Sequence, residues 1–240
     1  MTARRLAQTE WQSPAADATE QFVMNRPRRL CLAADRGYPE NEVGEKKSMS
    51  TADPNRVILT GENPFMRLSA KDGDPNSTDA SFWRILFCPA GPGHVLYMKS
   101  ELTENRWRIW SDNIAMARWL QTTVQGMLNA ETADVGIPVT EAEFSRAGDA
   151  RDFWTERVIT PEEEISLTWY RLGEPLLIHT RPHEVPDRRY GVCTILIPAL
   201  AARLTRNAMQ AAGQPWPRER EGRPFSTCAL AFSESWTESA

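Results

Sequence analysis

Three ionisable residues stand within or directly after apolar segments of this 240-residue chain, where acid–base chemistry is one use for them. Asp112 follows a tryptophan-rich run, His179 ends a largely apolar strand-like run, and Glu234 interrupts an apolar stripe near the C-terminus. A carboxylate in an apolar pocket has a raised pKa, and a neutral imidazole in such surroundings can serve as a general base. We therefore predict that Asp112, His179 and Glu234 are catalytic residues that transfer protons.

Each of these residues also has a structural explanation. Asp112 directly precedes a helical pattern, and capping of that helix by its carboxylate is the simpler role for it. A hydrogen-bonded structural histidine is likewise the simpler explanation of His179. Glu234 would need a charged partner if it were buried, because an unpaired buried charge is costly. The candidate partners are Arg84, Arg108, Arg157 and Arg171.

Tryptophan is abundant, with nine residues in the chain. One explanation is a large aromatic core. The other is a pocket for a small, largely apolar molecule, because such pockets are lined mostly by apolar and aromatic side chains. In the second interpretation four tryptophans shape the pocket, and one arginine orients a polar substituent of the ligand or holds a carboxylate ionised. These substrate-binding candidates are Trp83, Trp107, Arg108, Trp110 and Trp169.

Composition and missing motifs argue against several classes of protein. The net charge of −4 and the pI near 5.6 give no electrostatic basis for binding nucleic acid or an anionic membrane. No apolar run approaches the ~18 residues that a membrane helix needs. The GxSxG, GxxxxGKS/T and strand-linked GxGxxG motifs are absent from the sequence, which disfavours a serine hydrolase, a kinase and a nicotinamide-dependent dehydrogenase. We therefore expect no organic cofactor.

The metal-binding residue types do not form a site in the sequence. The four cysteines are scattered with no CxxC spacing, which argues against zinc and favours a reduced, cytoplasmic protein. His179 and His183 have the H-x3-H spacing that on a helix would place both rings on one face. Pro182 and the preceding apolar run indicate a strand end and a loop instead. We expect no metal site.

Hydrophobic periodicity predicts a chain made mostly of strands. Apolar residues at helical spacing predict one amphipathic helix over Asn113–Leu128. A capping-box pattern predicts a short helix over Glu141–Arg146, a second short helix is predicted over Pro198–Gly213, and Gln214–Pro224 is predicted to be a loop. The predicted strands are Arg56–Thr60, Phe82–Cys88, His94–Lys99, Trp107–Trp110, Phe153–Thr160, Glu164–Leu172, Pro175–Arg181, Tyr190–Ile197 and Thr227–Trp236.

The strand pattern predicts a mainly β fold for residues 49–240. Both faces of Phe82–Cys88 are largely apolar, which indicates a strand covered on both sides or bordering an interior cavity. Strands at roughly ten-residue spacing without a βαβ rhythm favour an antiparallel β-barrel or curled sheet of lipocalin-like architecture, plugged at one end by the amphipathic helix. Residues 1–48 lack periodicity and are predicted to be a disordered N-terminal extension, either from an over-long gene model or removed after synthesis.

These patterns lead to three functional hypotheses. The first is a cofactor-independent enzyme of lyase, isomerase or hydrolase type, acting on a small, largely apolar molecule in a Trp-lined cavity. The second is a non-catalytic carrier of a small hydrophobic ligand, and the third is an interaction domain whose tryptophans are simply core. Convergence of two or more predicted ionisable residues on one cavity would favour the enzyme. The expected partner is a small molecule rather than nucleic acid or a membrane. The sequence patterns are compatible with both a monomer and a homo-oligomer.

Overall fold

The structure, a computed structural model, describes residues 56–186 and 188–239, and all structural statements below concern those residues. The predicted N-terminal extension 1–48 lies outside the described residues. Among the described residues, no helix is both long enough and apolar enough to cross a bilayer.

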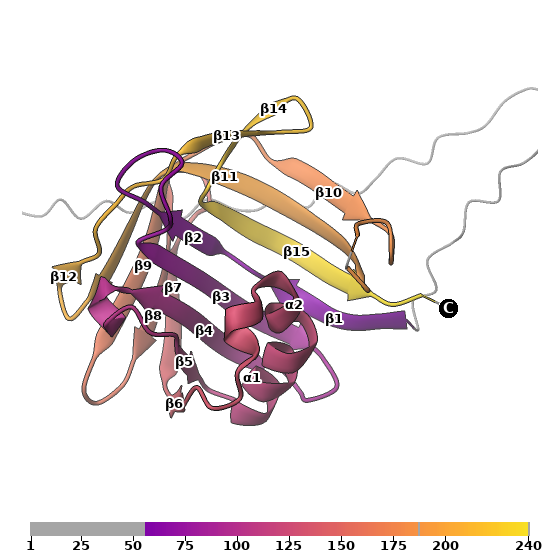
Figure 1. Ribbon diagram of the computed structural model, residues 1–240, viewed down its shortest axis with the longest axis horizontal. Coiled ribbons are helices and arrows are strands. Elements are labelled where there is room, and N and C mark those ends of the chain that lie inside the picture. The colour runs from indigo at the N-terminus through magenta and orange to yellow at the C-terminus, as the bar shows by residue number, and fades with distance from the viewer. Residues whose placement is uncertain (1–55, 187, 240) are drawn as a thin grey trace, which may run out of the picture. The chain divides into compact units, whose positions relative to one another are not determined.

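Most of the described residues belong to one 13-stranded sheet, whose main path runs in the order β6-β5-β4-β3-β1-β15-β11-β9-β8-β7 (Figure 1). Strands β2, β10 and β12 pair beside this path, and β13 and β14 form a separate hairpin. The strands are β1 (Val57–Glu62), β2 (Phe65–Leu68), β3 (Thr78–Phe87), β4 (Gly93–Ser100), β5 (Arg108–Ser111), β6 (Val139–Glu141), β7 (Glu143–Gly148), β8 (Phe153–Ile159), β9 (Glu164–Leu172), β10 (Leu176–Thr180), β11 (Gly191–Arg206), β12 (Met209–Gln210), β13 (Pro217–Arg220), β14 (Arg223–Ser226) and β15 (Ala229–Thr237).

The sheet is curled but is not a closed barrel. Its two edge strands, β6 and β7, are consecutive in the chain with only Ala142 between them, and no ladder of hydrogen bonds joins them among the described residues. The pairing of β5 with β6 is parallel, so the sheet is mixed rather than antiparallel throughout. The mainly β class and the curled sheet are therefore confirmed, whereas the closed antiparallel barrel is wrong.

The curl gives the sheet an inner and an outer face, each with its own apolar cluster. On the inner face, Phe82 and Leu96 pack in one cluster with Leu167 and Trp169 from the opposite wall. On the outer face, Trp83 packs in a second cluster that contains residues of the helix. Neighbouring residues of β3 thus point into different clusters. Of the two alternatives, a strand covered on both sides is the one observed at Phe82, Trp83 and Ile85, whereas Leu86 and Phe87 are exposed.

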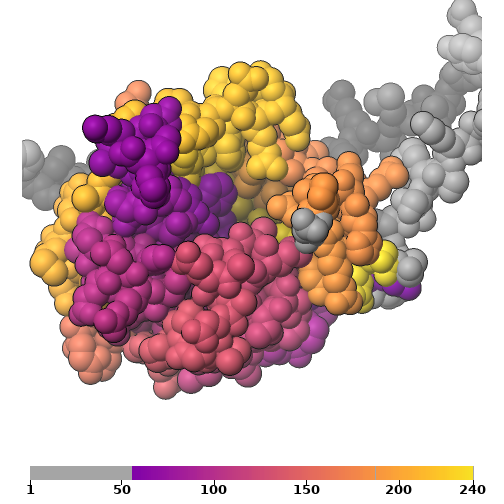
Figure 2. Space-filling model, in the orientation of Figure 1, coloured from indigo at the N-terminus to yellow at the C-terminus, as the bar shows by residue number. Residues whose placement is uncertain are grey.

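One helical segment covers the outer face, and it consists of α1 (Ile114–Leu120), the π-helical turn η3 (Gln121–Gln125) and α2 (Gly126–Leu128). It lies in front of the strands in the view of Figures 1 and 2. Two buried polar groups of the sheet bond to it. The Tyr97 hydroxyl donates to the carbonyl of Ala117 over 2.7 Å, and the Trp83 indole N–H donates to the Gln125 amide oxygen over 2.8 Å. The predicted helix is confirmed, with its first residue at Ile114.

Both predicted short helices are wrong. Glu141–Arg146 is the end of β6 and most of β7, where Phe144 pairs with Val158 and Arg146 pairs with Glu156. Pro198–Gly213 is the second half of β11, a tight turn and β12. Ladder bonds to a neighbouring strand and burial of alternate side chains outweigh helix propensities of a few tenths of a kcal/mol per residue.

The strands β2, β13 and β14 escaped the sequence patterns. The short strand β2 lies where no strand was predicted, and it pairs with β3 and β15. The predicted loop Gln214–Pro224 contains β13 and the beginning of β14, whose hairpin pairs from Pro217 to Ser226. A hairpin of polar residues carries no apolar alternation, so the sequence pattern could not reveal it.

The turn between β11 and β12 gives a test of the β11–β12 hairpin, which lies in the segment Pro198–Gly213 that was predicted to be helical. Asn207 and Ala208 have φ angles of 49° and 65°, as a two-residue hairpin turn requires. Alanine at positive φ is strained, so Ala208→Gly should raise the free energy of unfolding by about 0.5–1 kcal/mol, measured by urea denaturation. In a helix the same change would lower it by ~1 kcal/mol. The control is Ala201→Gly within β11, which should lower stability by about 0.5–1 kcal/mol. Destabilisation by both variants would contradict the hairpin.

Candidate functional site

The inner face changes from apolar to charged at one end of strands β3, β4 and β5. At this end, each of the three strands has a buried inner-face residue, and an ionisable residue lies two positions further along, either in the strand or directly beyond it. The buried residues are Phe82, Leu96 and Trp110, and the ionisable ones are Arg84, His94 and Asp112. Alternation along a strand keeps residues two apart on the same face, so all three ionisable groups lie at the inner rim of the curl.

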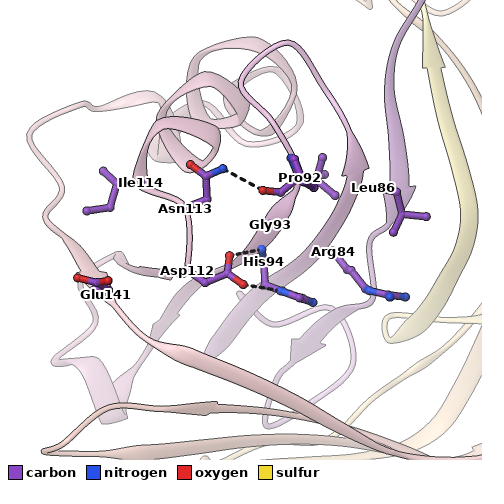
Figure 3. Close-up of a pocket in the computed structure, with 10 residues that line it drawn as sticks. Arg84, Leu86, Pro92, Gly93, His94, Asp112, Asn113, Ile114 and Glu141 are labelled. Carbon is purple, nitrogen blue, oxygen red and sulfur yellow. Dashed lines mark hydrogen bonds and ion pairs between the residues drawn. The ribbon is translucent and has the colours of Figure 1, made fainter.

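His94 and Asp112 form a tight pair at this rim (Figure 3). One carboxylate oxygen of Asp112 accepts the backbone N–H of His94 over 2.6 Å, and the other lies 2.6 Å from the imidazole Nδ1. The imidazole also stacks on the ring of Phe144, with centroids 5.2 Å apart and planes 15° apart. An ionised carboxylate only accepts, so it selects the imidazole tautomer that carries its hydrogen on Nδ1. In this tautomer Nε2 carries the lone pair that can accept a proton.

Two clefts meet at Asp112. The first, of about 730 Å³, is lined by Arg84, Ile85, Leu86, Pro92, Gly93, His94, Asp112, Asn113, Ile114 and Glu141. The second, of about 910 Å³, is lined by Asp112, Glu141, Ala142, Glu143, Phe144, Ile159, Thr160 and Pro161. Asp112 and Glu141 line both clefts, and the second cleft follows the seam where β6 passes into β7. The pair therefore lies where a small molecule can reach it.

Asp112 is not the helix cap. The cap is Asn113, whose extended backbone precedes α1 and whose side-chain oxygen accepts the backbone N–H of Met116 over 3.1 Å. The Asn113 amide also donates to the carbonyl of Pro92 over 2.9 Å, which holds the β3–β4 turn against the helix. The prediction that Asp112 caps the helix is therefore wrong, and Asp112 lines the two clefts instead.

A second charged network lies deeper behind the pair. Glu62 of β1 lies 3.5 Å from Arg84 and 2.8 Å from Arg146. Arg146 in turn lies 3.2 Å from Glu156, whose carboxylate also accepts the indole N–H of Trp154 over 2.9 Å. Glu156 is 1% exposed, and this burial raises its pKa to about 7 against the opposing effects of Arg146 and Trp154. This network joins the two walls of the curl.

Glu234 is buried on the other side of the sheet. Its carboxylate accepts the indole N–H of Trp236 over 2.6 Å, and Trp236 belongs to the outer-face cluster. Four interstrand steps separate β15, which carries Glu234, from β5, which precedes Asp112. Burial raises the pKa of Glu234 to about 7, while hydrogen bonds from Trp236, Thr194 and Asn63 oppose that rise. Glu234 lines none of the clefts described here.

His179 is exposed on β10, opposite Cys193 of β11, and lines none of these clefts. Asp112, His179 and Glu234 therefore do not converge on a common cavity. Within the described residues, no group of three or more histidine, cysteine or acidic side chains is arranged to hold a metal ion.

Three of the predicted pocket tryptophans are packed in the core. Trp83, Trp110 and Trp169 are at most 1% exposed, and none of them lines a cleft described here. Each indole N–H has a partner: Gln125 for Trp83, Glu163 for Trp110 and the carbonyl of Phe65 for Trp169. The structure thus agrees with the aromatic-core interpretation of these three residues.

Trp107 and Arg108 lie away from the His94–Asp112 pair. Trp107 borders a small cleft of about 220 Å³ and donates its indole N–H to Glu131 over 2.8 Å. Arg108 is half-buried on β5 opposite Met98 and lines none of the clefts described here. Arg84 is the arginine that lines the first cleft, beside His94.

His94 is the main residue that sequence reasoning missed, although a signal existed. The predicted strands His94–Lys99 and Trp107–Trp110 are joined by residues 100–106. If these strands form a hairpin centred on the middle of residues 100–106, His94 lies opposite Asp112. The observed pairing of Val95 with Ser111 has this register. Arg146 was missed for another reason, because its segment was predicted to be helical.

Comparisons of the chain with protein-family models, with curated proteins and with solved structures found no significant match. The site is therefore interpreted from its own geometry.

The raised pKa of Glu234 predicts a specific effect of pH on stability. Between pH ~4.5 and ~7 the folded state retains a proton that the unfolded state has lost, so the free energy of unfolding falls as pH rises through this interval. The Glu234→Gln side chain does not titrate, so the variant lacks this decrease in the free energy of unfolding. The stability of the variant relative to wild type should therefore increase by about 1–3 kcal/mol between pH 5 and pH 8 in urea denaturation.

Glu174→Gln, at an exposed position, is the matched control for this measurement. Its stability relative to wild type should not change over the same pH interval. Parallel pH profiles for wild type and Glu234→Gln would show that Glu234 does not hold its proton more tightly in the folded state.

Proposed function

We propose that this protein is an enzyme without an organic cofactor that performs acid–base chemistry on a small molecule at His94 and Asp112. The observation that carries the proposal is the 2.6 Å contact between His94 Nδ1 and the Asp112 carboxylate at the junction of two clefts. A carboxylate that orients an imidazole and stabilises its protonated form makes the opposite ring nitrogen an effective general base.

In the proposed mechanism, Nε2 of His94 takes a proton from the substrate or from a water molecule. The Asp112 carboxylate accepts the hydrogen bond from Nδ1–H throughout and stabilises the imidazolium that forms. The imidazolium then returns the proton to the product or leaving group. Stacking on Phe144 keeps the ring plane constant during both transfers. This sequence serves a lyase, an isomerase or a hydrolase, because each requires a proton to be taken from one atom and returned to another.

Arg84 is proposed to bind a polar or anionic group of the substrate. Its guanidinium lines the first cleft, of about 730 Å³, and lies beside His94, which pairs with it across β3 and β4 (Figure 3). Its ionic partner Glu62 is 3.5 Å away and also binds Arg146, so Arg84 retains N–H groups for a ligand. This is the role that the sequence assigned to Arg108.

The carrier hypothesis has less support. An apolar carrier needs an empty apolar interior, and the interior of this curl is filled by the inner-face cluster, which includes Trp110 and Trp169. We also propose a cytoplasmic location, which the free thiols of Cys88, Cys193 and Cys228 support.

The proposal predicts which substitutions remove activity. After a screen of small esters, hydroxy acids and keto acids with the full chain, His94→Gln should lower kcat/KM for any substrate found by about 100-fold or more, because the general base is lost. Asp112→Asn should cause a similar loss, because the imidazolium loses its stabilising charge. Turnover is followed by NMR, and circular dichroism checks folding.

The control is His183→Gln, a histidine in an exposed loop segment, which should retain wild-type kcat/KM. A folded His94→Gln variant with wild-type turnover would contradict the proposal. Loss of activity in His179→Gln in place of His94→Gln would return the catalytic role to the residue that the sequence pattern favoured.

A further inference from the structure

A single row of side chains crosses the inner rim of the sheet and includes the His94–Asp112 pair. It contains one residue from, or directly beside, each of seven neighbouring strands. In order from β10 through β11, β15, β1, β3 and β4 to the end of β5, these residues are Leu177, Ile195, Phe232, Glu62, Arg84, His94 and Asp112. We call this set the rim row. One half of it is apolar and the other half is charged.

Strand register joins the apolar half of the row. Leu177 pairs with Ile195, and Ile195 pairs with Phe232, so the three side chains lie on one face. Phe232 packs against the inner-face cluster, which shows that this is the inner face. The backbone N–H of Asn63 donates to the carbonyl of Ala231 over 2.9 Å, which places Phe232 beside Glu62 of the next strand.

The charged half continues from that point by direct contacts. Glu62 pairs with Arg84 in the strand register and lies 3.5 Å from its guanidinium. Arg84 pairs with His94, and His94 contacts Asp112. The apolar half of the row therefore leads directly to the proposed catalytic pair.

The opposite wall of the curl covers only part of the rim row. The ring of Phe144 stacks on His94, Arg146 binds Glu62, and Trp154 packs edge-on against Phe232 with centroids 5.3 Å apart. Beyond Trp154 the row is open. Ile195 is 37% exposed and Leu177 is 63% exposed.

Leu86 adds a further exposed apolar side chain on the lining of the first cleft, where it is 55% exposed. Leu177 and Ile195 pair across β10 and β11 and form one exposed apolar surface, and such a surface is typical of a ligand-binding site. Their connection to the charged half argues for one ligand that occupies both halves.

We infer that the substrate is an amphipathic carboxylate, whose head binds Arg84 beside His94 and whose apolar tail lies across Phe232, Ile195 and Leu177. This inference rests on the proposed function of the His94–Asp112 pair. A carboxylate fits Arg84 because a guanidinium offers several N–H donors to it. A cationic head fits less well, because both Asp112 oxygens already have contacts of 2.6 Å with His94.

The strand spacing gives the length of this ligand. Three interstrand steps separate β3, which carries Arg84, from β11, which carries Ile195. At ~4.8 Å per step this is roughly 14 Å along the sheet, and the curl shortens the direct path. A medium-length alkyl carboxylate reaches from Arg84 to Ile195, whereas a four-carbon acid does not.

The test compares decanoate with butanoate in isothermal titration calorimetry of the full chain. Wild type should bind decanoate at least tenfold more tightly than butanoate. The double variant Leu177→Ser/Ile195→Ser should lose at least tenfold in decanoate affinity and keep its butanoate affinity. Arg84→Gln should weaken both ligands. Because Leu177 and Ile195 are exposed, these changes should not prevent folding, which circular dichroism would check.

The matched control is Leu200→Ser, an exposed leucine of β11 that does not belong to the rim row. It should bind decanoate as wild type does. Equal affinities of wild type for the two acids would overturn the inference, as would equal decanoate binding by the double variant and Leu200→Ser. Tighter binding of decyltrimethylammonium than of decanoate would overturn the carboxylate head.

The binding readout separates this inference from the proposed function, because calorimetry of these acids requires no turnover. If the double variant binds decanoate normally while His94→Gln still abolishes turnover, only the amphipathic-substrate inference fails. If the rim row binds decanoate as expected while His94→Gln leaves turnover unchanged, only the catalytic proposal fails.

Discussion

The burial of both faces of β3, β4 and β5 is the constraint on which the rest of the structure depends. Inner-face residues such as Phe82 need a wall opposite them, and the sheet provides it by curling until β8 and β9 reach the same cluster. Outer-face residues such as Trp83 need a cover, which the helical segment provides. Removal of this apolar surface from water is the dominant favourable contribution to folding. On the inner face of these strands, Arg84, His94 and Asp112 lie beyond the packed segments, which is where the rim is charged.

Charges at the rim experience two different environments. Glu156 is buried, and its pKa of about 7 reflects a burial effect that the nearby Arg146 offsets only in part. Asp112 is exposed to the clefts and binds His94 through both oxygens. The deep network joins the two walls of the curl, and the exposed pair is accessible to a ligand. The first arrangement suits support of the site, and the second suits proton transfer with a substrate.

Sequence patterns predicted much of the fold where one strong periodicity was present. The strand Glu164–Leu172 has the predicted bounds, and the helix begins one residue after its predicted start. Segments rich in good helix formers but paired as strands were predicted wrongly, as at Pro198–Gly213. At the site, Asp112 was identified but its contacts were not. His94 and Arg146 needed a strand register and a strand assignment, respectively, which no local pattern supplied.

The sequence by itself determined the mainly β class, the two-sided burial of the central strands and the presence of isolated ionisable residues in apolar surroundings. These properties follow from local alternation and composition, which any single strand carries. Only the tertiary structure decided that the sheet stays open at the β6–β7 seam and that Glu234 faces away from Asp112. It also decided that His94 meets Asp112, because a contact across strands depends on register, and a shift of one residue would turn each side chain to the other face.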